Sequence, residues 1–237
     1  MGTDSQVSHW TQATKGGVMK IDLCNVYTRW INLDEKTDNA EMMEELFQRC
    51  GMKNTHRFSA IRKNATHPGV RPGEEHYPGI GESQFACMRD ICENGFPGLI
   101  LEDDVEVTDL FPHDGIIEVP DDADAVYLGI SHGDGNYNAV EVGKGLCKIS
   151  KMLSAHAILY TSDKYITEVL NFVPDAMYKQ NKPFDVFTYQ LQEKFNVYAF
   201  TTPLFYQADA KNNANKWEAM TRTPLKCQQA FRIGTMP

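Results

Sequence analysis

The stretch LILEDDVEV, residues 99–107, brings three aliphatic side chains directly against three acids, Glu102, Asp103 and Asp104. The aliphatic run suits a strand that is buried on both faces of a parallel sheet. Three adjacent carboxylates repel one another, so their arrangement costs free energy unless water solvates them or a cation lies among them. Two interpretations follow: a strand that ends in a solvated acidic loop, or a divalent-metal site at the carboxyl end of a parallel strand.

The sequence before this stretch alternates between strand and helix patterns. Residues 25–33 are rich in β-branched and aromatic side chains and predict a strand. Residues 39–50 place apolar side chains at helical spacing before Gly51, a natural helix stop, and residues 55–61 predict a second strand. Residues 64–81 are rich in Pro, Gly and His and predict a long loop, followed by a helix at residues 82–94.

The rest of the chain continues the alternation. The patterns predict strands at residues 99–101, 125–130, 139–146, 155–160 and 197–200, and helices at residues 162–172 and 184–195. Alternating β and α segments favour an α/β fold with a mixed, mostly parallel sheet and helices on both faces. We expect one domain at residues 21–210, a polar N-terminal lead-in at residues 1–20, and a C-terminal tail at residues 211–237 that packs on or near the site.

Composition narrows the classes of function. Of 237 residues, 42% are hydrophobic and 23% are charged, as in ordinary globular proteins, and the net charge of −9 disfavours a general affinity for duplex nucleic acid. No apolar stretch approaches the length of a membrane span, and the first residues lack the order of a signal peptide. Six cysteines without CxxC pairs then favour free thiols in a reducing cytoplasm, where we expect the protein to be located.

Polar residues follow several of the predicted strands. Asp34, the triplet Glu102 to Asp104, and His132 each come directly after a strand pattern. In open α/β sheets, ligands bind outside the carboxyl ends of the strands, and these ends would meet at one edge. The acidic triplet therefore lies where a ligand is expected, which favours the metal interpretation.

Seven segments resemble, in the same order, those of glycosyltransferase family 25. They are VYTRWINLDEKTDN, RFSAI, GIGESQFACMRDICENGFPGLILEDDVEV, DAVYLG, SAHAILYTSDKY, PFDVF and TPLFYQ, which together span about residues 25–210. No single segment is decisive, but seven in order are specific. The chain departs from the family's usual Arg, His and Tyr at Asn39, Gln84 and Ile158.

The resemblance implies a GT-A type domain that transfers a sugar such as a hexose, with inversion, from a nucleoside diphosphate sugar to a hydroxyl. UDP is the default nucleotide of the family, and Mn²⁺ or Mg²⁺ would bridge the acids and the diphosphate. Glu102 and Asp104 project to the same side if the backbone is extended, whereas Asp103 points away. We expect Asp104 to bind the metal directly and Glu102 to bind the metal, its water or the ribose. Expected contacts to the nucleotide sugar are Asn32, Leu33, Asp34, Ala60, Arg62, Ser83, Gln84 and Asp103.

The remaining roles have competing interpretations. A third metal ligand could come from His132 or His156, although a lone histidine is more often structural. Asp185, in PFDVF, lies among apolar residues that would raise its pKa into the range of a general base. The competing interpretation of Asp185 is an N-cap of the helix that follows.

The acceptor is not specified by the sequence. A saccharide hydroxyl fits best, and hydroxylated DNA bases, which some phage relatives of the family modify, need only a local basic groove around a flipped base. A non-catalytic binding module of the same fold is a further alternative, as is a metal-dependent phosphotransferase or nucleotidyltransferase. The chain carries no GxxxxGK[ST] loop, which argues against the common phosphotransferase class.

Overall fold

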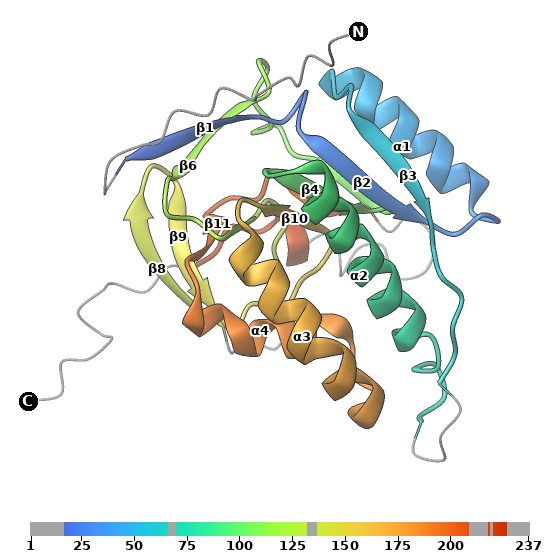
Figure 1. Ribbon diagram of the computed structural model, residues 1–237. Coiled ribbons are helices and arrows are strands. Elements are labelled where there is room, and N and C mark those ends of the chain that lie inside the picture. Colours follow the sequence, from blue (N-terminus) through green and yellow to red (C-terminus); the bar gives the residue numbers. More distant parts are fainter. Residues whose placement is uncertain (1–16, 66–69, 132–136, 209–217, 219, 227–237) are drawn as a thin grey trace, which may run out of the picture.

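The computed structural model describes residues 17–65, 70–131, 137–208, 218 and 220–226. These ranges contain an eight-stranded mixed sheet and two two-stranded sheets, with helices on both faces of the large sheet (Figure 1). The predicted α/β class and the helices on both faces are therefore confirmed. Within these ranges, no helix combines the length and apolarity that crossing a membrane requires.

The large sheet has the strand order β3-β2-β4-β10-β7-β11-β9-β8. In that order its strands are Thr55–Ser59, Tyr27–Asn32, Gly98–Glu102, Ala157–Tyr160, Ala125–Tyr127, Val197–Phe200, Leu146–Ser150 and Asn138–Gly143.

Parallel pairing is less common in this sheet than the sequence predicts. Three of the seven pairings are parallel: β2 with β3, β2 with β4, and β7 with β11. One reason is that the predicted strand at 139–146 is the hairpin β8–β9, in which Gly143, Lys144 and Gly145 adopt positive φ in the turn. A tight hairpin can join only antiparallel strands.

Two apolar cores hold the layers together. Helix α1 (Thr37–Cys50) buries Met43, Leu46 and Phe47 against one face of the sheet and ends at Gly51, which has the left-handed conformation of a C-cap (φ 69°). Helices α2 (Tyr77–Asn94), α3 (Asp163–Gln180) and α4 (Phe184–Leu191), the last continued by the 3₁₀ turn η1 (Gln192–Lys194), cover the other face.

Two small sheets of two strands each complete the β structure of the described residues. Strand β1 (Val18–Asp22) pairs with β6 (Ile116–Pro120), so residues 18–20 of the predicted lead-in form part of a strand. Strand β5 (Val105–Val107), which follows the acidic triplet directly, pairs with β12 (Phe205–Gln207). The second pairing brings the end of the predicted domain beside the acids.

Helix α2 begins at Tyr77, so the expectation that it begins at residue 82 is wrong. Pro78 and Gly79 look like loop residues in the sequence, but Pro is tolerated in the first turn, where its missing N–H has no partner to lose. Gly79 is required by packing, because a Cβ there would lie 2.4 Å from the carbonyl oxygen of Ile61. The first turns of α2 consequently pack closely against the segment that follows β3.

Candidate active site

A cavity of about 380 Å³ lies at the carboxyl ends of the parallel strands β2, β3 and β4, within the usual size range of small-molecule sites. This is the sheet edge at which the sequence predicts a ligand. The residues lining the cavity come from the three strand ends and from the first half of α2. They are Ile31, Leu33, Lys36, Ala60, Ile61, Arg62, Lys63, Asn64, His76, Gly79, Ile80, Ser83, Gln84, Glu102, Asp103 and Asp104.

All three acids of the triplet line the cavity. Glu102 ends β4, and the next two residues form a turn rather than extended strand, so the alternation of side chains stops there. The expectation that Asp103 points away is therefore wrong. Its Oδ2 accepts a 2.7 Å hydrogen bond from Nδ2 of Asn32, which fixes the triplet against the end of β2.

Asp104 is only half satisfied by the protein. Gln207, on β12, donates from Nε2 to Asp104 Oδ2 at 3.2 Å, and the backbone N–H of Ala208 donates to the Asp104 carbonyl at 2.7 Å. The other carboxylate oxygen, Oδ1, is buried and has no partner among the described residues. Buried polar atoms in folded proteins nearly always have a partner, so this oxygen is a position where a ligand is expected.

Burial and like charge make the acids reluctant to ionise. Burial, then the charges of Asp104 and Asp185, raise the pKa of Glu102 to about 8, and a hydrogen bond from Gln84 opposes this rise. Burial and the charge of Asp103 raise the pKa of Asp104 to about 6. A cation between Glu102 and Asp104 would favour the ionised form of both.

The cavity also carries three cationic side chains. The charge of Lys36 lowers the pKa of Asp104, and Lys36 forms no ion pair with any residue in the described ranges. Arg62 pairs with Glu35, and Lys63 Nζ contacts Glu82 Oε1 at 3.0 Å and the Tyr178 hydroxyl at 2.7 Å. Acidic and cationic side chains therefore line the same cavity. The acids would suit a metal ion, and the cationic side chains would suit an anion bound to that metal.

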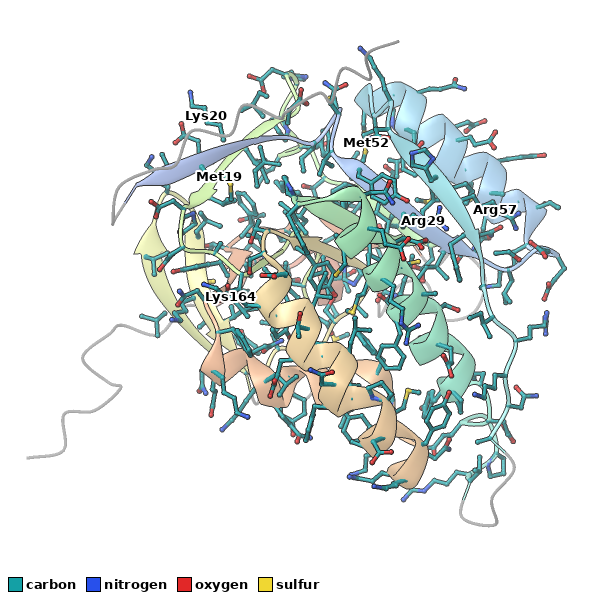
Figure 2. All side chains as sticks on the ribbon, viewed as in Figure 1. Met19, Lys20, Arg29, Met52, Arg57 and Lys164 are labelled. Atoms are coloured by element: carbon teal, nitrogen blue, oxygen red, sulfur yellow. The ribbon has the colours of Figure 1, made fainter. Side chains whose placement is uncertain are left out.

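Four of the eight expected nucleotide-sugar contacts, Leu33, Ala60, Arg62 and Asp103, line the cavity through strand ends or the segments after them. Two others support the site from outside. Asn32 lies behind Asp103, and Asp34 is exposed outside the cavity, where Ser59 and Arg57 hydrogen-bond it and lower its pKa. Arg57, labelled on β3 in Figure 2, also donates to Asn32 at 2.9 Å, so it joins both side chains to the sheet edge.

The last two, Ser83 and Gln84, reach the cavity from α2. Ser83 Oγ accepts from the Ile61 N–H at 2.9 Å and donates to the Gly79 carbonyl at 2.8 Å. Ser83 therefore holds the cavity wall in place. Ser83 lies inside α2, six residues after its start at Tyr77, so it is not at the helix N-terminus, and the Gly79 N–H of the first turns donates to the Lys63 carbonyl.

Of the two candidate histidines, the structure describes only His156, whose carbonyl accepts from the Glu102 N–H at 3.0 Å. His132 lies outside the described residues. His156 is 1% exposed and does not line the cavity; its Nδ1 lies 2.9 Å from Ser154 Oγ, and burial lowers its pKa to about 4. Its Nε2 packs against Gly129, where a Cβ would lie only 2.1 Å away. This Nε2 is buried and has no hydrogen-bond partner among the described residues, so His156 as a metal ligand stays a prediction.

The donor set suits a metal that shares its ligands with a substrate. Across residues 17–65, 70–131, 137–208 and 220–226, no three His, Cys, Asp or Glu side chains come together as a complete metal cage. Mg²⁺ and similar hard cations are commonly held by one or two carboxylates together with substrate phosphates and water. Glu102 and the unpaired Oδ1 of Asp104 fit that incomplete set.

Asp185 lies in the first turn of α4, and Pro183 occupies the N-cap position, so the N-cap interpretation of Asp185 is wrong. Its carboxylate accepts backbone hydrogen bonds at the helix start, while burial raises its pKa. Asp185 raises the pKa of Glu102, so it lies near the triplet, although it does not line the 380 Å³ cavity.

Two residues that act on Asp104, Lys36 and Gln207, were not among the predicted contacts. Lys36 lies two positions after Asp34 in the turn that follows β2, a signal that the same strand-end argument could have used. Gln207 is 103 residues away from Asp104, and no local pattern connects them.

Comparisons with known proteins give only distant likenesses. No protein-family model matches the chain, and the curated proteins contain no significant match. Among solved structures, it is similar to a nucleoside-diphosphate-sugar pyrophosphorylase from Vibrio cholerae RC9, with 11% identity over 76% of this chain and 75% of that one (TM-score 0.36). It is similar to a protein assigned as a glucose-1-phosphate thymidylyltransferase from Bacillus anthracis, in complex with a sucrose, with 11% identity over 84% and 78% (TM-score 0.43). A third is a glycosyltransferase involved in glycosylating the major capsid of PBCV-1, with 13% identity over 83% and 98% (TM-score 0.33). At these identities and scores the likenesses assign neither a family nor an activity.

Proposed function

We propose that the cavity binds a nucleoside diphosphate sugar together with Mn²⁺ or Mg²⁺, and that the protein transfers the sugar to a hydroxyl acceptor. The observation that carries this proposal is the buried, unpaired Oδ1 of Asp104 beside Glu102. The same cavity is lined by three cationic side chains. A UDP-linked hexose as donor and a saccharide as acceptor follow from the resemblance to glycosyltransferase family 25.

Glu102 and Asp104 would hold the divalent ion, which supplies neutralisation of the charge on a leaving diphosphate. Gln207 keeps the Asp104 carboxylate oriented toward the cavity by occupying its other oxygen. The raised pKa values of both acids are consistent with this role, because carboxylates that ionise reluctantly in the free protein gain most from a nearby cation.

The rest of the cavity provides complementary surfaces for a nucleotide. Lys36, Arg62 and Lys63 attract the diphosphate electrostatically. Ile61 and Ile80, which are 37% and 40% exposed, offer an apolar surface on which a nucleobase can be buried. Pockets for small ligands commonly combine such apolar walls with a few placed polar groups.

Asp185 is the proposed general base. The acceptor oxygen forms the bond to the anomeric carbon as the bond from that carbon to the diphosphate oxygen breaks. The bonding electron pair leaves with the diphosphate, and the acceptor's proton passes to the Asp185 carboxylate. A raised pKa suits this task, because a base works best when its pKa approaches the working pH.

Thermal unfolding with candidate ligands tests the proposal. UDP, GDP, CMP and UDP-sugars are added with and without Mn²⁺ to the wild type, to Asp104→Asn and to the charge-matched control Glu141→Gln on the far edge strand β8. A ligand of the native state raises the Tm by mass action. We expect a Mn²⁺-dependent rise with one nucleotide that Glu141→Gln keeps and Asp104→Asn loses. No rise with any nucleotide, or an equal rise in Asp104→Asn, would overturn the proposal.

A further inference from the structure

Gln84 is a buried residue that is also part of the cavity wall. It lies on α2 with no exposed surface, yet its side chain lines the cavity beside the Glu102 carboxylate, whose pKa it lowers. Its Nε2 also reaches the Ala155 carbonyl at 3.5 Å. Its Oε1 has no partner among the described residues.

The orientation of this amide follows from its surroundings. When a cation is bound at the acids Glu102 is ionised, and both polar neighbours of the amide, the Glu102 carboxylate and the Ala155 carbonyl, are then hydrogen-bond acceptors. The amide nitrogen must therefore face them, since the opposite orientation would place Oε1 against two other acceptors. The unpaired atom is consequently an oxygen, which can only accept a hydrogen bond.

We infer that Oε1 of Gln84 accepts a hydrogen bond from a hydroxyl of the bound ligand, which makes Gln84 a specificity-determining residue for a polyol. This inference rests on the proposed function and sharpens it. A phosphate oxygen cannot satisfy Oε1, whereas a hydroxyl can. The hydroxyl can belong to the transferred sugar or be the 2′-hydroxyl of the ribose.

A second buried glutamine shows what a structural amide looks like in the same protein. Gln192 also has no exposed surface, but its Nε2 donates to the Tyr127 hydroxyl at 3.0 Å and to the Met152 carbonyl at 2.9 Å, and its Oε1 accepts from the Met152 N–H at 2.8 Å. Every polar atom of the Gln192 amide is used by the fold. Gln192 is therefore the matched control for Gln84.

Calorimetric titration of four proteins separates the roles. The wild type, Gln84→Met, Gln84→His and Gln192→Met are titrated, with Mn²⁺ present, against UDP, 2′-deoxy-UDP, UDP-glucose, UDP-galactose, GDP and GDP-mannose. Methionine matches the glutamine shape without its polar atoms, whereas neutral histidine keeps one donor and one acceptor.

Loss of one ligand hydrogen bond should weaken binding about tenfold. If the hydroxyl belongs to the sugar, Gln84→Met weakens binding of the nucleotide sugar and leaves the affinity for the nucleoside diphosphate unchanged. If it is the 2′-hydroxyl of the ribose, Gln84→Met weakens binding of UDP. The variant then binds UDP no more tightly than 2′-deoxy-UDP. In both cases Gln84→His recovers affinity, and Gln192→Met lowers the Tm without changing the ratios between ligands.

Two results would overturn the inference while the proposed function stands. One is unchanged affinity of Gln84→Met for every ligand that the wild type binds. The other is an equal loss for all ligands, including the 2′-deoxy and sugar-free forms. Failure of the wild type to bind any of the six nucleotides is a separate result, which would overturn the proposed function and this inference with it.

Discussion

Asp104 and Asp124 belong to two acidic clusters of the same chain, EDD at residues 102–104 and DDAD at residues 121–124. Both carboxylate oxygens of Asp124 are paired: Oδ1 accepts from Ser162 Oγ at 2.8 Å, and Oδ2 accepts from the Asn196 N–H at 3.0 Å. Asp104 has one oxygen paired with Gln207 and one buried oxygen without a partner. Two similar sequences thus acquire opposite hydrogen-bonding states.

The difference shows that the fold uses both oxygens of Asp124 and only one oxygen of Asp104. The protein supplies donors to Asp124 from two distant segments, so this carboxylate ties α3 and the start of β11 to β7. A buried acceptor left unpaired costs about 1–3 kcal/mol, and proteins retain such costs mainly at functional sites. Substitutions in the two clusters should therefore affect different properties.

The largest expected effect is on ligand binding by Asp104→Asn. Removing the charge of a metal ligand should weaken Mn²⁺-dependent nucleotide binding by about a hundredfold or more, while Asp124→Asn should leave the affinity of the folded protein unchanged. Calorimetric titration at a temperature where both variants are folded measures this. Equal losses in the two variants would remove the functional distinction between the clusters.

The next effect is on stability, with the roles of the clusters reversed. Asp124→Ala leaves the Ser162 hydroxyl and the Asn196 N–H without their partner and should lower the free energy of unfolding by about 2–3 kcal/mol. Asp104→Asn should lower it by much less, because one of its oxygens has no partner to lose. Urea unfolding checks both values, and a greater loss in Asp104→Asn would contradict the assignment.

Sequence reasoning predicted the place of the acidic triplet but not this distinction. The run Leu99 to Leu101 predicted a buried strand, and the strand-end rule predicted a ligand cavity at its carboxyl end. The donors that decide the outcome are 38 and 72 residues away from Asp124, and 103 residues away from Asp104. Such pairings depend on the completed fold, and no local pattern contains them.

The start of α2 shows a second limit of the sequence pattern. Pro78 and Gly79 resemble loop residues, although the first turn of a helix tolerates Pro and close packing against Ile61 requires Gly. The predicted loop therefore included Gly79 and Ile80, two of the four α2 residues that line the cavity. Propensity describes isolated residues, whereas here the contact between two segments determines the structure.

The raised pKa of Glu102, in the first cluster, should make the stability of the protein depend on pH. Below about pH 4.5 Glu102 is protonated in both the folded and the unfolded chain, and its raised pKa has no effect. As the pH rises toward about 8 the unfolded chain releases this proton while the folded protein retains it, so the metal-free protein loses stability through that window. Glu102→Gln should remove this loss and raise the Tm at pH 8 by a few degrees, with little change at pH 4.

Thermal unfolding of the metal-free protein across this range measures the effect. The control is Glu141→Gln, which removes an equal charge from an exposed position. If Glu141→Gln stabilises the protein at pH 8 as much as Glu102→Gln does, relief of overall negative charge explains the gain, and Glu102 has no special role.

The smallest expected effect comes from Gln207, the donor that distinguishes the two oxygens of Asp104. Gln207→Met removes the 3.2 Å hydrogen bond to Oδ2, while the backbone of Gln207 stays anchored because its N–H donates to Thr221 Oγ1 at 3.0 Å. An orienting partner of a metal ligand contributes about tenfold to metal affinity. We therefore expect Gln207→Met to weaken Mn²⁺ binding in the presence of nucleotide about tenfold. Free Mn²⁺ measured by electron paramagnetic resonance reports this directly. Unchanged affinity would mean that the Asp104 carboxylate is oriented by its own turn and by the Ala208 N–H. The different hydrogen-bond donors of Asp104 and Asp124 would then have no functional consequence.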